Sequence, residues 1–175
     1  MKVILVMVST VNGKITRGLD PLVTHWTSEE DQHAFSDLKK QHNLIVMGRH
    51  TYEAGSKRIQ LSKNILRIVL TKKPERFIKK TVPGQLEFSD EKPKQLLDRL
   101  QSAGFKTMLL VGGAEVNSSF FQAQLVNELH VTIEPKLFGS GKNLLGDVPL
   151  EINLELTKIQ KLNERGTLLL MYSVI

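Results

Sequence analysis

Apolar residues along this chain form short continuous runs separated by stretches of helical periodicity. The runs at Val3–Val8, Leu44–Met47 and Thr107–Val111 contain hardly any polar side chain. Strands with such runs are buried on both faces, which is typical of parallel strands covered by helices. The pattern therefore predicts an α/β fold with a mostly parallel central sheet and helices on both of its faces.

Further strands follow from the same pattern, at Ile65–Leu70, Leu86–Phe88 and Glu128–Ile133. The end of the chain differs in character. Two strand-like segments, Leu154–Leu162 and Thr167–Val174, flank a turn that ends in Gly166. This spacing predicts a β-hairpin, so antiparallel strands should close one edge of the sheet.

Helix signals lie between the predicted strands. Thr27–Glu30 has the spacing of a capping box with Thr27 as the cap, and it predicts a helix that extends to about His42. Pro93 suits a first helical turn, so a second helix is expected over Lys94–Ser102. A third is predicted from about Ala114 to Gln122. The alternation of strands and helices shows no repeat and no linker, so residues 1–175 are expected to form a single domain.

Composition narrows the possible classes of protein. Hydrophobic residues make up 41% of the chain and charged residues 24%, and no apolar run is long enough to span a membrane. The apolar amino terminus lacks a cleavage pattern and is interpreted as a strand rather than a secretion signal. Cysteine is absent, which excludes disulfides and thiolate chemistry. A cytoplasmic protein without a membrane partner is the resulting expectation.

The net charge of +6 comes from Lys and Arg residues spread along the chain, with only short pairs such as Lys39-Lys40 and Lys79-Lys80. Nucleic-acid binding usually requires a dense basic patch with interleaved aromatic residues. We therefore expect no nucleic-acid partner. The charge instead favours an anionic small molecule.

Candidate chemistry lies at the ends of three predicted strands. These ends are Gly48-Arg49-His50-Thr51, Leu70-Thr71-Lys72-Lys73 and Val111-Gly112-Gly113-Ala114. Taken singly, they could be an ordinary strand-to-helix turn, a surface pair of cations and a tight glycine turn. Taken together, they place backbone amides and cations where ligands bind in parallel sheets. Two of the three carry cations, which suits a dinucleotide with a 2′-phosphate.

These segments, in this order, resemble the dihydrofolate reductase superfamily, and specifically the reductase domain at the carboxy terminus of the bifunctional riboflavin deaminase-reductases (RibD type). The likeness also includes Ser9–Ile15, Thr27–Glu29, Leu125–Leu129 and Pro135–Gly141. It implies a three-layer fold like that of dihydrofolate reductase.

The resemblance further implies NADPH as the cofactor. Its contacts would be Val8, Ile15, Gly48, Arg49, His50, Thr51, Leu70, Thr71, Lys72, Val111, Gly112, Gly113, Ala114, Glu115 and Val116. Relatives have a cis peptide between the paired glycines, and the same is expected here. Lys14 and Asn12 would act in catalysis, whereas Trp26 and Thr27 would line the substrate pocket. For Trp26, a place in the core is an equal alternative.

Three positions depart from the riboflavin-type pattern, all on the substrate side. Asn12 stands where Asp is usual, Gly55–Lys57 where Asp-Asn-Pro is usual, and Val111 where Glu is usual. An Asn side chain cannot exchange a proton as Asp does, so an acid-base role at Asn12 is in question.

The leading hypothesis is an NADPH-dependent reductase of a pyrimidine or pterin-like heterocycle, with 5-amino-6-(5-phosphoribosylamino)uracil as the first candidate substrate. One alternative is a dihydrofolate reductase, in which Glu30 or Asp31 would face the pterin. Another is a non-catalytic NADP-binding protein. The histidines lack metal-ligand spacing, so no metal is expected. The hairpin and the strand at Leu129–Ile133 would leave a sheet edge for a homodimer.

Overall fold

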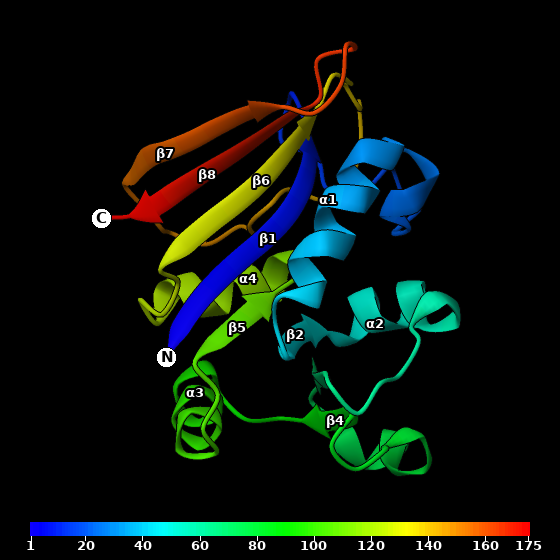
Figure 1. Ribbon diagram of the computed structural model, residues 1–175, viewed down its shortest axis with the longest axis vertical. Coiled ribbons are helices and arrows are strands. Elements are labelled where there is room, and N and C mark those ends of the chain that lie inside the picture. Colours follow the sequence, from blue (N-terminus) through cyan, green and yellow to red (C-terminus); the bar gives the residue numbers. More distant parts are fainter.

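One eight-stranded sheet organises the whole chain, as the computed structural model of residues 1–175 shows (Figure 1). In the order in which they pair, the strands are β4 (Leu86–Ser89), β3 (Leu66–Leu70), β2 (Leu44–Gly48), β5 (Thr107–Leu110), β1 (Lys2–Thr10), β6 (Glu128–Glu134), β8 (Leu168–Val174) and β7 (Leu154–Lys161). All pairings from β4 to β6 are parallel. β8 pairs antiparallel with β6 and with β7, which confirms the predicted sheet and its closing hairpin.

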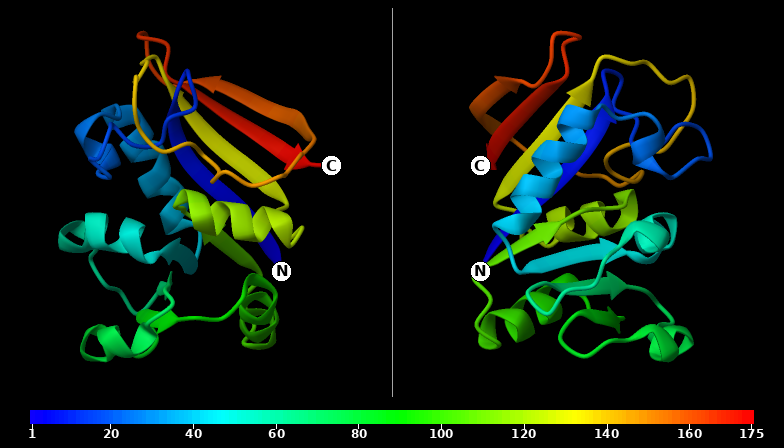
Figure 2. Two further views of the ribbon diagram at one scale, coloured as in Figure 1. Left: turned by 180° about the vertical axis from the view of Figure 1, so that it is seen from behind. Right: turned by 45° about the vertical axis from the view of Figure 1, so that its right-hand side comes forward.

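Helices cover both faces of this sheet, as predicted. They are α1 (Glu29–Lys40), α2 (Arg49–Gly55), α3 (Pro93–Ser102) and α4 (Ala114–Gln122), with short 3-10 helices η1 (Val23–His25), η2 (Ser56–Arg58) and η3 (Pro74–Lys80). Figure 2 shows α1 and α4 on opposite faces of the sheet. None of the helices is long and apolar enough to cross a membrane.

The two faces are filled to different extents. A cluster of 15 buried apolar residues packs α3 and α4 against the sheet and includes Leu96, Leu100 and Phe120. The cluster on the α1 and α2 face has only 7 buried residues, among them Ile45 and Tyr52. The space that apolar side chains leave unfilled on the α1 face is available to a ligand.

The start of α1 differs in detail from the prediction. Ser28, and not Thr27, is the N-cap: its hydroxyl accepts the amide of Asp31 at 3.3 Å, and the side chain of Thr27 is instead close to Gln32. A tertiary contact explains the shift, because the amide of Ser28 donates to a carboxylate oxygen of Glu134 at 2.6 Å. The helix also ends at Lys40, before the predicted His42. Pro93 occupies the first turn of α3, as predicted.

The sheet edges also differ from the prediction. β6 lies between β1 and β8, so the strand at Leu129–Ile133 is not an edge. The edges are β4 and β7. Every residue of β7 is exposed, and three of them, Leu154, Leu156 and Ile159, are large and apolar. Of the two edges, β7 is therefore the one that offers an exposed apolar surface to a partner copy.

Candidate functional site

A cavity of about 2000 Å³ follows the carboxyl ends of β2, β3 and β5 and continues between α1 and the sheet. Pockets for a single small ligand usually measure roughly 300–1,000 Å³. The volume is therefore sufficient for a dinucleotide together with a second molecule. Strand ends of a parallel sheet are also where ligands of α/β proteins bind.

The residues predicted to hold the cofactor converge on this cavity. Its walls include Val8, Ile15, Gly48, Arg49, His50, Thr51, Leu70, Thr71, Lys72, Val111, Gly113, Ala114, Glu115 and Val116. Only Gly112 of the predicted set does not line it. The carbonyl of Gly112 accepts the amide of Gly48 at 2.7 Å and so joins the ends of β5 and β2. The peptide between Gly112 and Gly113 is cis, as expected.

Crowding explains the glycines at these strand ends. Gly112 has a φ of +87°, a region that side chains disfavour, and a Cβ there would lie 2.9 Å from the sulfur of Met7. A Cβ on Gly48 would lie 3.0 Å from Cγ2 of Val116. The absence of side chains lets the two turns pack together and exposes their backbone to the cavity.

The amino terminus of α4 points its first amides toward this space. Gly113 is the N-cap and has no side chain to accept a hydrogen bond from them. Ala114, Glu115 and Val116 line the cavity, and the first backbone hydrogen bond of the helix is donated by Asn117. Free amides at a helix start carry partial positive charge and favour an anion such as a pyrophosphate.

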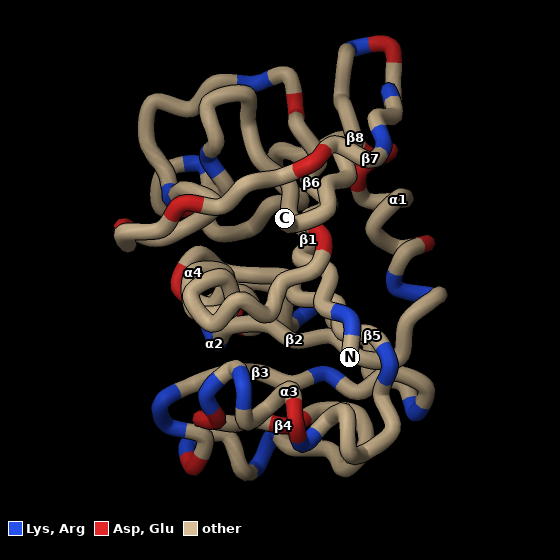
Figure 3. The backbone as a smooth tube through the Cα atoms, turned by 90° about the vertical axis from the view of Figure 1, so that its left-hand side faces the viewer, with Lys and Arg blue, Asp and Glu red and all other residues tan.

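Cations lie at the β3 end of the cavity. The loop after β3 carries Lys72 and Lys73, both exposed, on a side of the molecule where Figure 3 shows several Lys and Arg residues. The guanidinium of Arg49 donates to Glu53 at 2.7 Å and to the ring of His50, also at 2.7 Å. A phosphate bound at Arg49 would thus compete with the carboxylate of Glu53.

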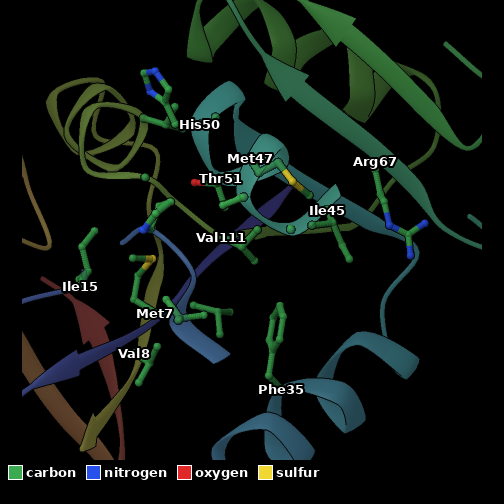
Figure 4. A pocket seen from close by; sticks show the side chains of 18 of the residues that line it. Met7, Val8, Ile15, Phe35, Ile45, Met47, His50, Thr51, Arg67 and Val111 are labelled. Carbon is green, nitrogen blue, oxygen red and sulfur yellow. The ribbon is translucent and has the colours of Figure 1, made fainter. Parts of the chain in front are cut away.

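Apolar side chains form the deeper part. Figure 4 shows Met7, Val8 and Ile15 on the left of the pocket and Phe35 of α1 to the right of them. Val8 is 8% exposed and Ile15 is 5% exposed. Such an apolar surface suits a flat ring.

The two predicted catalytic residues do not line the cavity. The ammonium of Lys14 donates to the side-chain oxygen of Asn143 at 2.9 Å, and the amide group of Asn12 donates to the carbonyl of Phe138 at 2.8 Å. Both residues therefore join the turn after β1 to the loop after β6. The structure gives them a role in loop architecture and does not bring them together with the strand-end residues.

Trp26 and Thr27 have different surroundings. Trp26 is 4% exposed and makes an edge-to-face contact with Phe138, with the ring centroids 5.2 Å apart. It does not line the cavity, which favours the core alternative for this residue. Thr27 does line the cavity. Its hydroxyl also hydrogen-bonds Asp31 and lowers the pKa of that carboxyl.

Asp31 is the buried charged residue of α1 that lines the cavity, and it is only 8% exposed. Burial raises the pKa of its carboxyl to about 6; a hydrogen bond with Thr132 opposes the rise, and the nearby charge of Glu134 adds to it. A carboxyl with such a pKa exchanges protons near neutral pH and is typical of a functional site. The sequence had pointed to this residue only through the dihydrofolate reductase alternative.

Glu134 is a buried residue that sequence reasoning missed. It is 1% exposed, and its two carboxylate oxygens accept the amide of Ser28 at 2.6 Å and the hydroxyl of Thr167 at 3.0 Å. It therefore connects β6 to the start of α1 and to the start of β8. The available signal was an acidic residue at the end of an otherwise buried strand, which is costly unless the charge has a partner.

No group of three His, Asp or Glu side chains in the chain is arranged to hold a metal ion.

Comparisons with known proteins agree with this architecture. A family model described as the RibD C-terminal domain matches residues 1–168. Uncharacterized protein YyaP of Bacillus subtilis (strain 168) is 26% identical over 139 residues, which are 75% of this chain and 74% of that protein.

Solved structures give the same fold. A pyrimidine reductase-like protein from Corynebacterium diphtheriae has a TM-score of 0.81 at 16% identity, covering 99% of this chain and 92% of that one. A Thermotoga maritima diaminohydroxyphosphoribosylaminopyrimidine deaminase/5-amino-6-(5-phosphoribosylamino)uracil reductase has a TM-score of 0.77 at 18% identity, covering 99% of this chain but 56% of that one. The riboflavin biosynthesis reductase Rib7 of Saccharomyces cerevisiae has a TM-score of 0.68 at 16% identity, covering 99% and 90%. At these identities the likeness concerns the fold.

Proposed function

The chain belongs to the RibD C-terminal domain family, and from that premise we propose that it is an NADPH-dependent reductase of a pyrimidine or pterin-like heterocycle. The observation that carries the proposal is the single cavity that collects residues predicted separately from three strand ends. Residues as far apart in the chain as Val8 and Val116 line it together. An ordinary turn at Gly48–Thr51, or a surface basic pair at Lys72-Lys73, would have no reason to line the same cavity as the other strand ends.

In the proposed complex, the 2′-phosphate of NADPH lies near Arg49, Thr71 and Lys72. The free amides at the start of α4 bind the pyrophosphate, and Val8 and Ile15 pack against the nicotinamide. Two observations support this arrangement: the helix start has no capping side chain, and the cations line the same cavity. The cofactor would supply the hydride, so the protein's task is to hold the nicotinamide and the substrate together and to donate or accept a proton.

Asp31 is the proposed proton-exchanging group on the substrate side. Its carboxylate would accept hydrogen bonds from ring N–H groups and, when protonated, would supply the proton that accompanies the hydride. The raised pKa of about 6 supports this role, because the group can then hold or release a proton near neutral pH.

Two candidate substrates follow. The first is 5-amino-6-(5-phosphoribosylamino)uracil, which the family resemblance favours. The second is dihydrofolate, which one specific observation favours: an acidic residue of the first helix, Asp31, lies buried in the cavity, whereas Lys14 and Asn12 are engaged elsewhere.

Binding of the cofactor is tested by titration with NADPH and NADH, followed through the fluorescence of the reduced nicotinamide. We expect NADPH to bind at least about 10-fold more tightly, because the 2′-phosphate gains charge-assisted hydrogen bonds. Arg49→Gln should remove most of that preference. Lys79→Gln, an exposed cation outside the cavity, is the control. Equal affinities for both cofactors in the wild type would contradict the proposal.

Turnover is tested by the loss of reduced-nicotinamide absorbance with each candidate substrate. Oxidation of NADPH with one of them identifies the substrate class. Tight binding of NADPH without turnover of any pyrimidine or pteridine would favour the non-catalytic alternative.

We also propose a homodimer that forms through β7. The exposed apolar residues Leu156 and Ile159 on this edge strand support the proposal. Light scattering during size-exclusion chromatography should give twice the mass of one chain, and Ile159→Lys should shift the population toward monomer. A wild-type protein that is monomeric at all concentrations would contradict it.

A further inference from the structure

Glu134 of β6 is a second buried carboxyl close to Asp31. Its side chain is 1% exposed and does not line the cavity, whereas Asp31 does. Thr132, two residues earlier on β6, hydrogen-bonds the carboxyl of Asp31. Residues two apart in a strand point to the same face of a sheet, so Glu134 follows Thr132 on the face that meets the start of α1. Two carboxyls therefore share one poorly solvated region.

Backbone contacts also join the two residues. The amide of Ser28 donates to one carboxylate oxygen of Glu134 at 2.6 Å, and the hydroxyl of Ser28 accepts the amide of Asp31 at 3.3 Å. Ser28 is the N-cap of α1, so Glu134 holds the residue from which the helix starts. The position of Asp31 in the first turn is thus fixed from β6.

Glu134 acts as an acceptor at both of its oxygens. The second oxygen accepts the hydroxyl of Thr167 at 3.0 Å. That hydroxyl itself accepts a hydrogen bond from the side-chain amide of Asn163 at 3.0 Å, which leaves its own proton for Glu134. The ammonium of Lys136 lies 4.0 Å from the same oxygen of Glu134. Two donors and a cation suit an ionised carboxylate.

Asp31 has different surroundings. Its side-chain partners are the hydroxyls of Thr27 and Thr132, which can donate to a carboxylate or accept from a protonated carboxyl. It takes part in none of the ion pairs of the chain. Burial raises the pKa of Asp31 to about 6, and the negative charge of Glu134 adds to the rise. When two neighbouring carboxyls share one proton, it resides on the one whose partners tolerate it.

The other charges around this pair lie nearer to the surface. Glu30 of α1 is exposed, and its carboxylate accepts the side-chain amide of Asn163 at 3.0 Å. Arg165 and His33 are its charged neighbours. Lys136 is the cation that contacts Glu134, and its side chain is 42% exposed. Glu134 is therefore the buried negative charge that acts on Asp31.

We propose that Glu134 is a positioning residue of the reductase: as a permanent anion it keeps a proton on Asp31 and, through Ser28, holds Asp31 toward the substrate. The inference rests on the proposed function, which gives Asp31 the proton-exchanging role. In turnover, the proton that accompanies the hydride leaves the carboxyl of Asp31 for the substrate. Asp31 is then a carboxylate and regains a proton from water. Repulsion from Glu134 favours that return.

The test compares four variants. Glu134→Gln is nearly isosteric and keeps an acceptor for the amide of Ser28, but it removes the charge. Thr167→Val removes one hydrogen bond to Glu134 and leaves its charge in place. Lys136→Met removes the cation that lies 4.0 Å from Glu134. Glu29→Gln removes an exposed carboxylate in the first turn of α1 and is the control.

The first readout is the titration of the Asp31 carboxyl in the ligand-free proteins, followed by carbon-13 NMR and assigned with Asp31→Asn. Glu134→Gln should lower the midpoint by about 0.5–1 pH unit, because a negative neighbour is lost. Lys136→Met should raise it by about 0.2–0.5 pH unit, because a positive neighbour is lost. Thr167→Val and Glu29→Gln should change it by less than about 0.2 pH unit.

The second readout is turnover at two pH values. A lower midpoint leaves a smaller protonated fraction of Asp31 at pH 7, so Glu134→Gln should be about 3- to 10-fold slower there. At pH 5 the carboxyl is largely protonated in both proteins, and the difference should be less than about 2-fold. A residue with a purely structural role would lower turnover equally at both pH values, and this is what we expect of Thr167→Val.

An unchanged midpoint in folded Glu134→Gln, or an equal loss of turnover at pH 5 and pH 7, would overturn the proposal. If Glu134→Gln does not fold, Lys136→Met decides, since it alters a half-exposed side chain; an unchanged or lower midpoint would then overturn the proposal. The NMR titration needs no ligand and no turnover. Shifted midpoints in a protein that reduces no heterocycle would therefore support the control of Asp31 by Glu134 and contradict the reductase.

Discussion

The cavity has two halves that are built in different ways. The cofactor half consists of strand-end turns, glycines and the start of α4, with cations such as Lys72 exposed at its rim. The substrate half consists of single side chains from α1, β3 and β6, and its buried carboxyl, Asp31, is 8% exposed. Under the proposed function, one half would recognise its ligand largely through the backbone, and the other through buried charge.

This difference has energetic consequences. Exposed cations change the free energy of unfolding only modestly, because water solvates them. A buried charge without a full partner destabilises the folded protein, and the cost is tolerated where the group has a function. We therefore expect substitutions in the substrate half to reduce activity while they preserve or increase stability. Substitutions of the glycines in the cofactor half should reduce both.

The largest expected effect is that of Asp31→Asn. Loss of an acid-base group typically reduces turnover by about 10²- to 10⁴-fold, and we expect a loss in that range with little change in NADPH affinity. The measurement is steady-state turnover from pH 5 to 9, in which the variant should lose the pH dependence that Asp31 causes. Glu29→Gln, which replaces an exposed carboxylate two residues away, is the control. An active Asp31→Asn enzyme would contradict the assigned role.

The next effect concerns Gly112→Ala. Alanine would be held at a φ of +87° and would press on the sulfur of Met7, 2.9 Å from the added Cβ. We expect a loss of about 1–3 kcal/mol in unfolding free energy and about a 10-fold weaker affinity for NADPH. Gly84→Ala is the matched control, because Gly84 has a φ of +71° and open space around it. Equal effects of the two substitutions would show that crowding at the glycine pair is unimportant.

The pH dependence of stability gives a third prediction. The pKa of Asp31 is about 6 in the folded protein and 3.8 without burial, so the folded state binds the proton more tightly. Its contribution to the unfolding free energy is therefore favourable at low pH and falls as the pH rises from about 4 to 6, by roughly 1–3 kcal/mol. Denaturant unfolding of the wild type and of Asp31→Asn should show a difference that grows over this interval, with the variant more stable at pH 7. A constant difference would contradict the pKa shift.

The smallest effect is expected for Glu53→Gln. The substitution frees the guanidinium of Arg49, which donates to Glu53 at 2.7 Å, and should raise NADPH affinity by about 2- to 5-fold at low salt. Asp98→Asn removes a similar ion pair, Lys94–Asp98 at 2.7 Å on α3, and should leave the affinity unchanged. Unchanged affinity in Glu53→Gln would show that Arg49 does not contact the phosphate.

Sequence patterns determined the layers of this protein and predicted most of the strand-end residues that line the cavity. Continuous apolar runs predicted the parallel strands, the turn at Gly166 predicted the hairpin, and the family likeness indicated the glycine pair and Arg49. These features were accessible because each depends on a few consecutive residues. The backbone conformation of the strand end explains why glycine occurs there, wherever the strand lies in the sheet.

Only the tertiary structure decided which side chains share the substrate half. Asp31 looked like one of three acidic residues at a helix start. Glu134 gave no sign that it would accept the amide of Ser28, 106 residues earlier in the chain. Lys14 and Asn12, which the resemblance places in catalysis, form hydrogen bonds with Asn143 and Phe138 of the loop after β6, and their catalytic role stays a prediction. Burial and charge pairing arise from contacts between distant segments, and they determine which ionisable groups remain free to bind a ligand.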